Sequence, residues 1–487
     1  MFKDYYECRI WLENFIPHTW TRKELGLERI SYLLKLLGNP QNKFKSIHIA
    51  GTSGKGSTAF YIARLLEISL EVKGKDAGLV RRSGKRETSL NPKTLNQTSF
   101  LTHKLLTRPK IGLHLSPHLV DIRERLQING KLIPMNRFVK IIGEIKPFVE
   151  SMKDSKVGLP SYFEILVAAS FLYFAKERVD WAVVEVGLGG RLDATNVLNP
   201  QLTVITNVGL DHTDILGTKV EKIAYEKAGI IKPKVPIVTG AVSKALEVIE
   251  KVAKQKKAPL ITVDTQSLEK TLKSDLFNNI NLPIDIFRST PYSFVFSNKL
   301  LALAAVKTLE IPLQKRQTAK AFSGTFPGRL EEIEKGVILD GAHNADKVRS
   351  LIEFVRNSNP ETRNSKQIQK SKIQNPKSII LVIAFKKGKD WKKMVDLLVK
   401  NLPVSKVIAT KFYAVTDMGK HQAVDPKEIA DYVRSVYRLP TTVYSNSHDA
   451  VFSALTSNNY STNQLILVTG SLYLVGEART VWHLPKF

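Results

Sequence analysis

The 487-residue chain has little cysteine, a shortage of acidic side chains and no long apolar run. Its one cysteine, Cys8, excludes an internal disulfide framework and a cysteine-based metal cluster, and it suits a reducing compartment. The longest apolar stretch, residues 165–175, is too short to cross a bilayer, and the first residues lack the apolar segment of a signal peptide. We therefore expect a cytoplasmic protein without a membrane partner.

Acidic residues are outnumbered, since 45 Asp and Glu stand against 73 Lys and Arg and leave a formal net charge of +28. Such a surplus first suggests nucleic-acid binding. Residues 81–110 hold eight basic residues against one acidic, and residues 356–377 hold six against one. Both stretches lack helical or strand periodicity and have almost no aromatic residues, so they predict solvated basic insertions. A positive field that attracts anionic small molecules is the interpretation we adopt, with no nucleic-acid partner.

What the chain does contain is a recurring alternation of apolar strand-like runs and helical patterns. The strand-like runs are residues 46–50, 111–115, 181–186, 203–206, 237–238, 336–339, 378–384, 406–410, 442–444 and 464–468. The helical patterns include residues 59–70, 162–175, 220–228 and 298–309. This alternation predicts parallel sheets covered on both faces. Because Pro327 and Gly328 interrupt regular structure, we expect two α/β domains, 1–324 and 325–487.

The segment 48–58 reads His-Ile-Ala-Gly-Thr-Ser-Gly-Lys-Gly-Ser-Thr and joins a strand-like run to a helical pattern. Its three glycines allow the backbone to approach an anion closely at a helix N-terminus. Lys55 adds a positive charge, and Ser57 or Thr58 offers a hydroxyl to a phosphate or a metal. The strict phosphate-loop pattern fails, because its first glycine is missing and Gly56 follows the lysine. We interpret the segment as a loop that binds nucleotide phosphates.

Polar or glycine-rich segments follow five of the predicted strands, where ligands bind in open parallel sheets. They are residues 116–118, 187–195, 207–212, 340–344 and 469–471. Glu164, one turn into an apolar helix, either caps that helix or meets a cation. His212 follows Asp211 and is either a metal ligand or a helix cap, and Lys227 near a helix end is by default a partner of the helix dipole. The spacing leaves these alternatives open.

Taken together, the motifs resemble the folylpolyglutamate synthase/dihydrofolate synthase family, the folate branch of the Mur-type amide ligases. They run in family order as residues 25–29, 51–58, 116–119, 124–125, 162–164, 185–196, 211–217, 226–232, 327–331, 340–344 and 469–473. The segments 185–196 and 469–473 point to the folate branch in particular. The resemblance implies an N-terminal P-loop-type parallel-sheet ATPase domain and a smaller, Rossmann-like α/β C-terminal domain.

The resemblance further implies an ATP-dependent ligase. ATP would phosphorylate a carboxylate, and the amine of L-glutamate would attack the acyl phosphate. The expected partners are ATP, L-glutamate, and dihydropteroate or reduced folates, the expected cofactor is Mg²⁺ at two sites, and the expected state is a monomer. Two alternatives remain open: another Mur-type ligase acting on a cell-wall precursor, and a nucleotide-regulated nucleic-acid-binding protein that uses the basic stretches.

Residue roles are carried over from the same resemblance. The expected ATP contacts are Thr52, Ser53, Gly54, Lys55, Gly56, Ser57, Thr58, Asn298, Arg329 and Asp340. The expected metal ligands are Ser116, Glu164, His212 and Lys227, the last as a carbamate. The expected catalytic residues are Lys55, Lys227, His212 and His343, and the expected pterin contacts are Lys23, Glu24 and Leu25.

Overall fold

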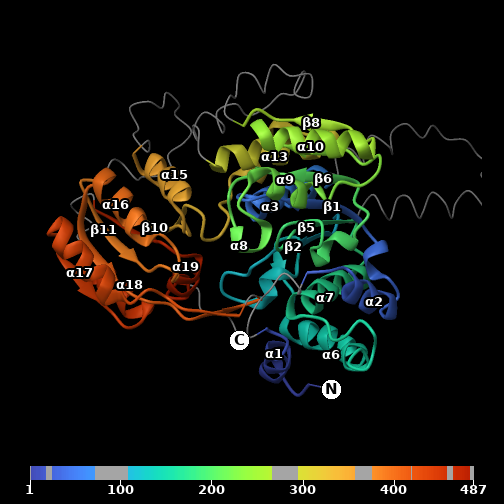
Figure 1. Ribbon diagram of the computed structural model, residues 1–487, viewed down its shortest axis with the longest axis horizontal. Coiled ribbons are helices and arrows are strands. Elements are labelled where there is room, and N and C mark those ends of the chain that lie inside the picture. Colours follow the sequence, from blue (N-terminus) through green and yellow to red (C-terminus); the bar gives the residue numbers. More distant parts are fainter. Residues whose placement is uncertain are drawn as a thin grey trace, which may run out of the picture.

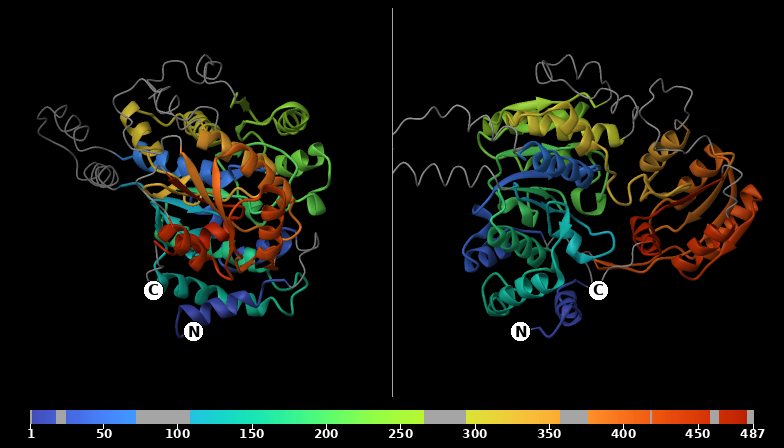
Figure 2. Two further views of the ribbon diagram at one scale, coloured as in Figure 1. Left: turned by 90° about the vertical axis from the view of Figure 1, so that its left-hand side faces the viewer. Right: turned by 180° about the vertical axis from the view of Figure 1, so that it is seen from behind.

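The computed structural model describes residues 2–17, 25–71, 108–265, 294–356, 376–417, 419–457 and 464–482. They form two α/β bodies that lie side by side, each built on its own sheet (Figure 1). The view from behind in Figure 2 shows the same arrangement. Lys23, Glu24 and most of the two basic stretches lie outside the described residues, so the expectations about them stay predictions.

The N-terminal body contains an eight-stranded sheet in the order β4-β3-β2-β5-β1-β6-β7-β8. All neighbours from β2 to β8 are parallel, and β3 and β4 extend one edge as an antiparallel hairpin. The strands are β1 (Lys45–Ala50), β2 (Ile111–His114), β3 (Gln127–Ile128), β4 (Lys131–Leu132), β5 (Trp181–Glu185), β6 (Leu202–Ile205), β7 (Ile237–Thr239) and β8 (Leu260–Thr262).

Helices cover both faces of this sheet. They are α1 (Tyr5–Glu13), α2 (Glu28–Leu36), α3 (Lys55–Ser69), α6 (Met135–Ser151), α7 (Tyr162–Glu177), α8 (Thr213–Leu216), α9 (Val220–Ala228), α10 (Ser243–Lys256), α13 (Phe294–Thr308) and α14 (Lys315–Phe322), with short 3-10 turns at Pro40–Asn42, Ile122–Arg125 and Ala194–Val197. On the central strand β5, Ala182 and Val184 pack in the core with α7, whereas Val183 packs with α3 and α13. Burial on both faces explains why these strands are continuously apolar.

The C-terminal body contains a six-stranded sheet in the order β15-β12-β11-β16-β10-β9, in which only β9 runs antiparallel among the described strands. Its strands are β9 (Glu331–Glu334), β10 (Val337–Leu339), β11 (Ser378–Ile383), β12 (Val404–Ala409), β15 (Thr441–Val443) and β16 (Gln464–Thr469), and a separate hairpin pairs β13 (Ala414–Thr416) with β14 (Gly419–His421). One face packs on α15 (Ala345–Arg356), α16 (Trp391–Asn401) and α17 (Pro426–Tyr437), and the other on α18 (Ser447–Ser457) and α19 (Leu472–Arg479).

A buried ion pair joins the two bodies. The Arg125 guanidinium, fully buried, donates to both carboxylate oxygens of Asp417 at 2.9 and 2.7 Å, across 292 positions of sequence. Its Nε donates to His118 Nδ1 at 3.0 Å. A Cβ added at Gly476 would lie 2.1 Å from the Leu119 carbonyl oxygen, so the segment after β2 touches the second body directly.

The structure confirms the α/β class and all ten strands expected from the sequence, each with ends within two residues of the prediction. The strands that the sequence did not predict are short edge or hairpin strands: β3, β4, β8, β9, β13 and β14. The expected domain boundary after residue 324 falls in the connection between the two sheets and stays a prediction. No helix in the described part of the chain combines the length and apolar character needed to cross a bilayer.

Candidate active site

A cavity of about 1070 Å³ lies at the carboxyl ends of strands from both sheets, as expected for open parallel sheets. Its wall contains most of the residues expected at the site: Leu25, Thr52, Ser53, Gly54, Lys55, Gly56, Ser57, Ser116, Glu164, His212, Asn298, Arg329, Asp340 and His343. Thr58 and Lys227 are buried. The fold therefore brings together residues that are up to 318 positions apart in the sequence (343 − 25).

The glycine-rich loop follows β1 and ends at Gly54, the residue that precedes α3. Gly54 has φ of +81°, and a Cβ there would lie 2.1 Å from Asn298 Oδ1. A Cβ at Gly51 would lie 1.9 Å from Thr206 Oγ1. Both positions exclude a side chain because other elements pack directly against the loop backbone.

The loop is also held by hydrogen bonds to the segment after β6. Ser53 N donates to Asn207 Oδ1 at 2.9 Å, and Thr206 Oγ1 donates to the Ser53 carbonyl at 2.6 Å. Thr52 Oγ1 lies within hydrogen-bond distance of both the N–H and the carbonyl of Gly209, at 3.0 and 3.1 Å. The loop is thus rigidly supported before any ligand binds, which is what an anion site needs.

Two lysines converge on one carbonyl of this loop. Lys55 Nζ donates to the Gly51 carbonyl at 3.2 Å, and Lys227 Nζ, from the end of α9, donates to the same oxygen at 3.0 Å. Burial and the neighbouring Lys55 lower the pKa of Lys227 to about 7. Neither lysine forms an ion pair with a carboxylate of the described residues. An anion bound beside the two lysines would stabilise their close approach.

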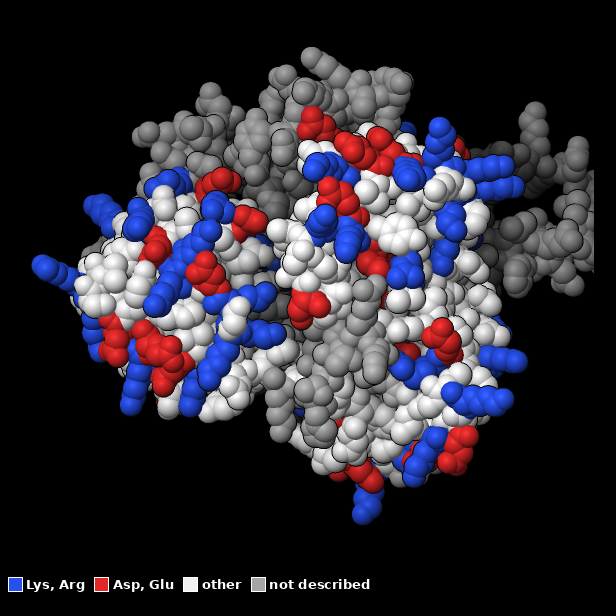
Figure 3. All heavy atoms as spheres, in the orientation of Figure 1, with Lys and Arg blue, Asp and Glu red and all other residues white. Residues whose placement is uncertain are grey.

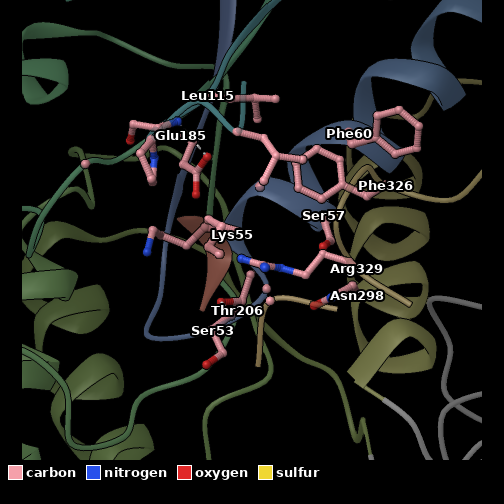
Figure 4. Close-up of a pocket in the computed structure, with 18 of the residues that line it drawn as sticks. Ser53, Lys55, Ser57, Phe60, Leu115, Glu185, Thr206, Asn298, Phe326 and Arg329 are labelled. Atoms are coloured by element: carbon pink, nitrogen blue, oxygen red, sulfur yellow. Dashed lines mark hydrogen bonds between the residues drawn. The ribbon is translucent and has the colours of Figure 1, made fainter. Parts of the chain in front are cut away.

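Glu185 ends β5 near Lys55, and the sequence reasoning did not assign it a role. Its Oε2 accepts from Ser116 N at 3.0 Å, and the side chain is buried. Burial raises the pKa of Glu185, and the nearby Lys55 opposes that shift. The Ser116 hydroxyl is buried without a partner in the described residues. Figure 4 shows Lys55, Glu185 and Arg329 around the same open space.

Glu164 is held by its own helix. It forms a capping box with Ser161, whose backbone N–H donates to Glu164 Oε2 at 2.7 Å. The same oxygen accepts from Arg29 Nε at 3.0 Å. Its second oxygen, Oε1, is buried and has no partner in the described residues. Of the two interpretations left open by the sequence, the cap is present, and the metal-ligand role stays a prediction.

His212 lies directly before α8 with φ of +48°, and its ring is 3.9 Å from the Asp211 carboxylate. Burial lowers the pKa of His212, which favours the neutral imidazole that metals bind. Among the described residues, no three His, Cys, Asp or Glu side chains are grouped so that they could hold a metal by themselves. A cation here would therefore need a mixed set of ligands that includes hydroxyl, nucleotide or modified lysine oxygens.

The second body contributes the opposite wall. Both oxygens of Asp340 accept backbone N–H groups, from Leu330 and Ala342, each at 2.9 Å. Asp340 therefore shapes the two turns that carry Arg329 and His343. Asn298, at the start of α13, accepts from Thr58 Oγ1 at 3.3 Å and keeps a buried Nδ2 without a partner in the described residues. Its expected contact with ATP stays a prediction.

The described residues on the face drawn in Figure 3 show no corresponding cation patch. On the face drawn in Figure 3, Lys and Arg side chains of the described residues are spread over both bodies with Asp and Glu among them. The positive surplus that the sequence shows is thus mixed with negative charge on this face. Inside the cavity, Lys55, Arg329 and Lys347 line one space.

Comparison with known proteins follows the two bodies. A family model described as "Mur ligase middle domain" matches residues 135–304, and one described as "Dihydrofolate synthetase, C-terminal domain" matches residues 328–481. The dihydrofolate synthase/folylpolyglutamate synthase of Bacillus subtilis is 30% identical over 502 aligned residues, which cover 98% of this chain and 99% of the relative. The chain belongs to this family.

Other members of the folylpolyglutamate synthase/dihydrofolate synthase family are also similar to this chain in sequence and in fold. The dihydrofolate synthetase of Saccharomyces cerevisiae is 29% identical over 93% of this chain and 97% of its own. The folylpolyglutamate synthase structure from Thermotoga maritima superposes with a TM-score of 0.70 at 29% identity, over 99% and 97% of the two chains. The Mycobacterium tuberculosis enzyme, solved with ADP and AMPPCP, gives 0.72 at 25% identity, over 99% and 100%. The resemblance and the two-domain Mur-ligase fold are confirmed.

Proposed function

We propose that this protein is an ATP-dependent ligase that joins the amino group of L-glutamate to the carboxylate of a reduced folate or of dihydropteroate. Family membership supports the reaction class. The observation that carries the proposal is the pair of lysines, Lys55 and Lys227, that donate to the Gly51 carbonyl in the loop before α3. Arg329 lines the same cavity from the second body. This is a site for a polyphosphate.

ATP binding is assigned to the glycine-rich loop. The free N–H groups at the start of α3 and its dipole favour the phosphates, and Lys55 adds a full charge. Arg329 lines the same space from the second body. Because the site is divided between two bodies, their closure would complete it. Asn298 and the hydroxyls of the first turn of α3 are assigned to the nucleotide as well.

The reaction then proceeds in two steps. An oxygen of the acceptor carboxylate attacks the γ-phosphorus of ATP, and ADP leaves. The neutral amine of glutamate attacks the acyl carbon, phosphate leaves with the bonding electron pair, and the amine proton passes to a base. Lys55 and Arg329 stabilise the negative charge on the transferred phosphoryl group. His343 is assigned to the side where the amine enters.

Magnesium is proposed at this site, in two positions. Two oxygen donors fit a hard cation: the Ser116 hydroxyl is buried without a described partner, and Glu185 supplies a buried carboxylate. His212 would add a neutral imidazole, a ligand more usual for transition metals. When bound, the metal would neutralise phosphate charge and orient the phosphates. Glu185 is proposed as the carboxylate ligand of magnesium, the role that the sequence reasoning gave to Glu164. The Oε2 atom of Glu164 already accepts hydrogen bonds from Ser161 and Arg29.

Lys227 is proposed as the carbamylated lysine. Only the neutral amine reacts with carbon dioxide, and a pKa of about 7 leaves a large neutral fraction at physiological pH. The carbamate would replace a buried cation with an anion able to bind the second magnesium. The resulting contact with Lys55 would be attractive, whereas the present one is repulsive.

The acceptor range is proposed to include dihydropteroate as well as folates. The match to a dihydrofolate synthetase domain over residues 328–481 and the likeness to the Saccharomyces enzyme support this breadth. Leu25, which lines the cavity, is proposed at the pterin together with Lys23 and Glu24. The protein is proposed to act as a cytoplasmic monomer.

The test is an ADP-release assay with Mg²⁺ that compares dihydropteroate with tetrahydrofolate, each with and without L-glutamate. Glutamate-dependent ADP release with either acceptor is expected, and release with both would establish the broader range. Release only with a UDP-sugar peptide would identify a cell-wall ligase instead. ATP turnover that responds to DNA or RNA and not to a pteroate would favour the nucleic-acid-binding alternative.

A further inference from the structure

Lys347, in the first turn of α15, reaches the cavity and contacts His343. Its Nζ lies 2.9 Å from His343 Nε2, and His343 Nδ1 lies 2.8 Å from the Gly341 carbonyl. A carbonyl oxygen only accepts, so Nδ1 carries the imidazole proton and Nε2 offers a lone pair to Lys347. The cavity wall of the second body therefore presents a cationic donor beside an uncharged acceptor.

No carboxylate of the described residues forms an ion pair with Lys347. Lys55, Arg329 and Lys389 disfavour its charged form, whereas Asp211 favours it. Burial, more than these neighbours, lowers the pKa of Lys347 to about 7. A lysine in the first turn of a helix also meets the positive end of the helix dipole.

A cation placed so unfavourably gains most when an anion arrives. The phosphates of ATP already have Lys55, Arg329 and the N–H groups at the start of α3. The two remaining substrates of the proposed reaction, the acceptor and glutamate, both carry carboxylates, but glutamate also carries the free amino group. A donor cation and an acceptor nitrogen side by side match a carboxylate and an amino group on one molecule.

We propose that Lys347 binds a carboxylate of the incoming L-glutamate, while His343 Nε2 accepts a hydrogen bond from its amino group. This inference rests on the proposed function. Lys347 exchanges its hydrogen bond to His343 for one to the carboxylate, which frees the lone pair that then orients the amine. Lys347 is thus a residue that selects the amino-acid substrate and not a contact of the nucleotide.

The experiment compares Lys347→Met, Lys347→Gln and Lys347→Arg with the full-length wild type in the ADP-release assay, titrating glutamate and ATP separately. We expect the KM for glutamate to rise at least about 10-fold in the Met and Gln variants, because a charge-assisted hydrogen bond is lost. The KM for ATP should stay within about 3-fold. Arginine should recover part of the loss, since it keeps the charge.

Arg349→Met is the matched control, because it removes a cation from an exposed position of the same helix whose ion pair is with Asp346. It should leave both KM values unchanged. An unchanged KM for glutamate in Lys347→Met, or a rise in the KM for ATP instead, would overturn the inference and leave the proposed function standing. A wild type without glutamate-dependent ADP release would refute the proposed function itself.

Discussion

Two isosteric substitutions, Glu185→Gln and Glu164→Gln, decide which carboxylate serves the metal. Glutamine at 185 can still accept the hydrogen bond from Ser116 N through its amide oxygen, so the backbone geometry should survive. The substitution removes one negative charge from the space shared with Lys55. Because burial already disfavours that charge, the free energy of unfolding should not fall. The loss should appear in metal binding instead.

The expected size follows from the charge removed. If the lost interaction matches a hydrogen bond to a charged group, roughly 1.5–3 kcal/mol, the Mg²⁺ concentration for half-maximal activity rises about 10- to 150-fold. Manganese should show a shift in the same direction, because it also prefers oxygen ligands. The KM for ATP at saturating Mg²⁺ should change less.

Glu164→Gln should behave in the opposite way. The Glu164 carboxylate is 3% exposed and is shared by the Ser161 N–H and the partly exposed Arg29. Removing its charge replaces the ion pair with Arg29 by a neutral hydrogen bond, and it removes a negative charge from the first turn of α7. We expect a loss of about 1–3 kcal/mol in unfolding free energy, with the Mg²⁺ requirement unchanged.

Both variants are measured by Mg²⁺ titration of ADP release and by urea unfolding monitored by circular dichroism. Separate effects, on Mg²⁺ for Glu185→Gln and on stability for Glu164→Gln, would support the assignment of Glu185. If instead Glu164→Gln shifts the Mg²⁺ titration and Glu185→Gln does not, the geometric reasoning is wrong. The expectation drawn from the sequence would then hold.

Further predictions concern the loop and the buried histidines. Gly54→Ala should raise the KM for ATP by at least about 10-fold, because its Cβ would meet Asn298 Oδ1. Gly38→Ala is the control, since Gly38 has a similar φ of +77° and open space around it. It should cost only about 1–2 kcal/mol of stability and leave the KM for ATP unchanged. Burial lowers the pKa of His48 and His114 from 6.5 to about 3. Unfolded chains therefore take up protons that the folded protein does not, and unfolding free energy should fall below pH 6.5 by up to about 1.4 kcal/mol per pH unit for each histidine. Urea titrations at pH 7 and pH 5 with equal midpoints would contradict this.

The sequence predicted the strands of both sheets well because their apolar runs are buried on two faces. Ile379, Leu381 and Ile383 face one helical layer, and Ile380 and Val382 face the other. Short edge strands escaped prediction because they carry no such run. The β9 strand, for example, reads Glu-Glu-Ile-Glu and is defined by its pairing with β10.

The site was predictable where one segment contains the chemistry, as in the glycine-rich loop. It was less predictable where the fold decides which groups meet. Glu185 lies next to the last residue of the predicted strand 181–186, and that position was a signal from which the sequence could have suggested a ligand role. Arg125 and Asp417 meet across 292 positions, so only the three-dimensional arrangement identifies this contact.

The most direct test of nucleotide binding by the glycine-rich loop is a crystal structure of the protein with AMPPNP and Mg²⁺, solved for the wild type and for Lys55→Ala. We expect the phosphates to lie against the N–H groups at the start of α3, with the γ-phosphate contacted by Lys55 and Arg329. We also expect Lys55→Ala to abolish ligation with the fold intact. A nucleotide bound elsewhere with the loop empty, or near-normal turnover by Lys55→Ala, would contradict this mechanism.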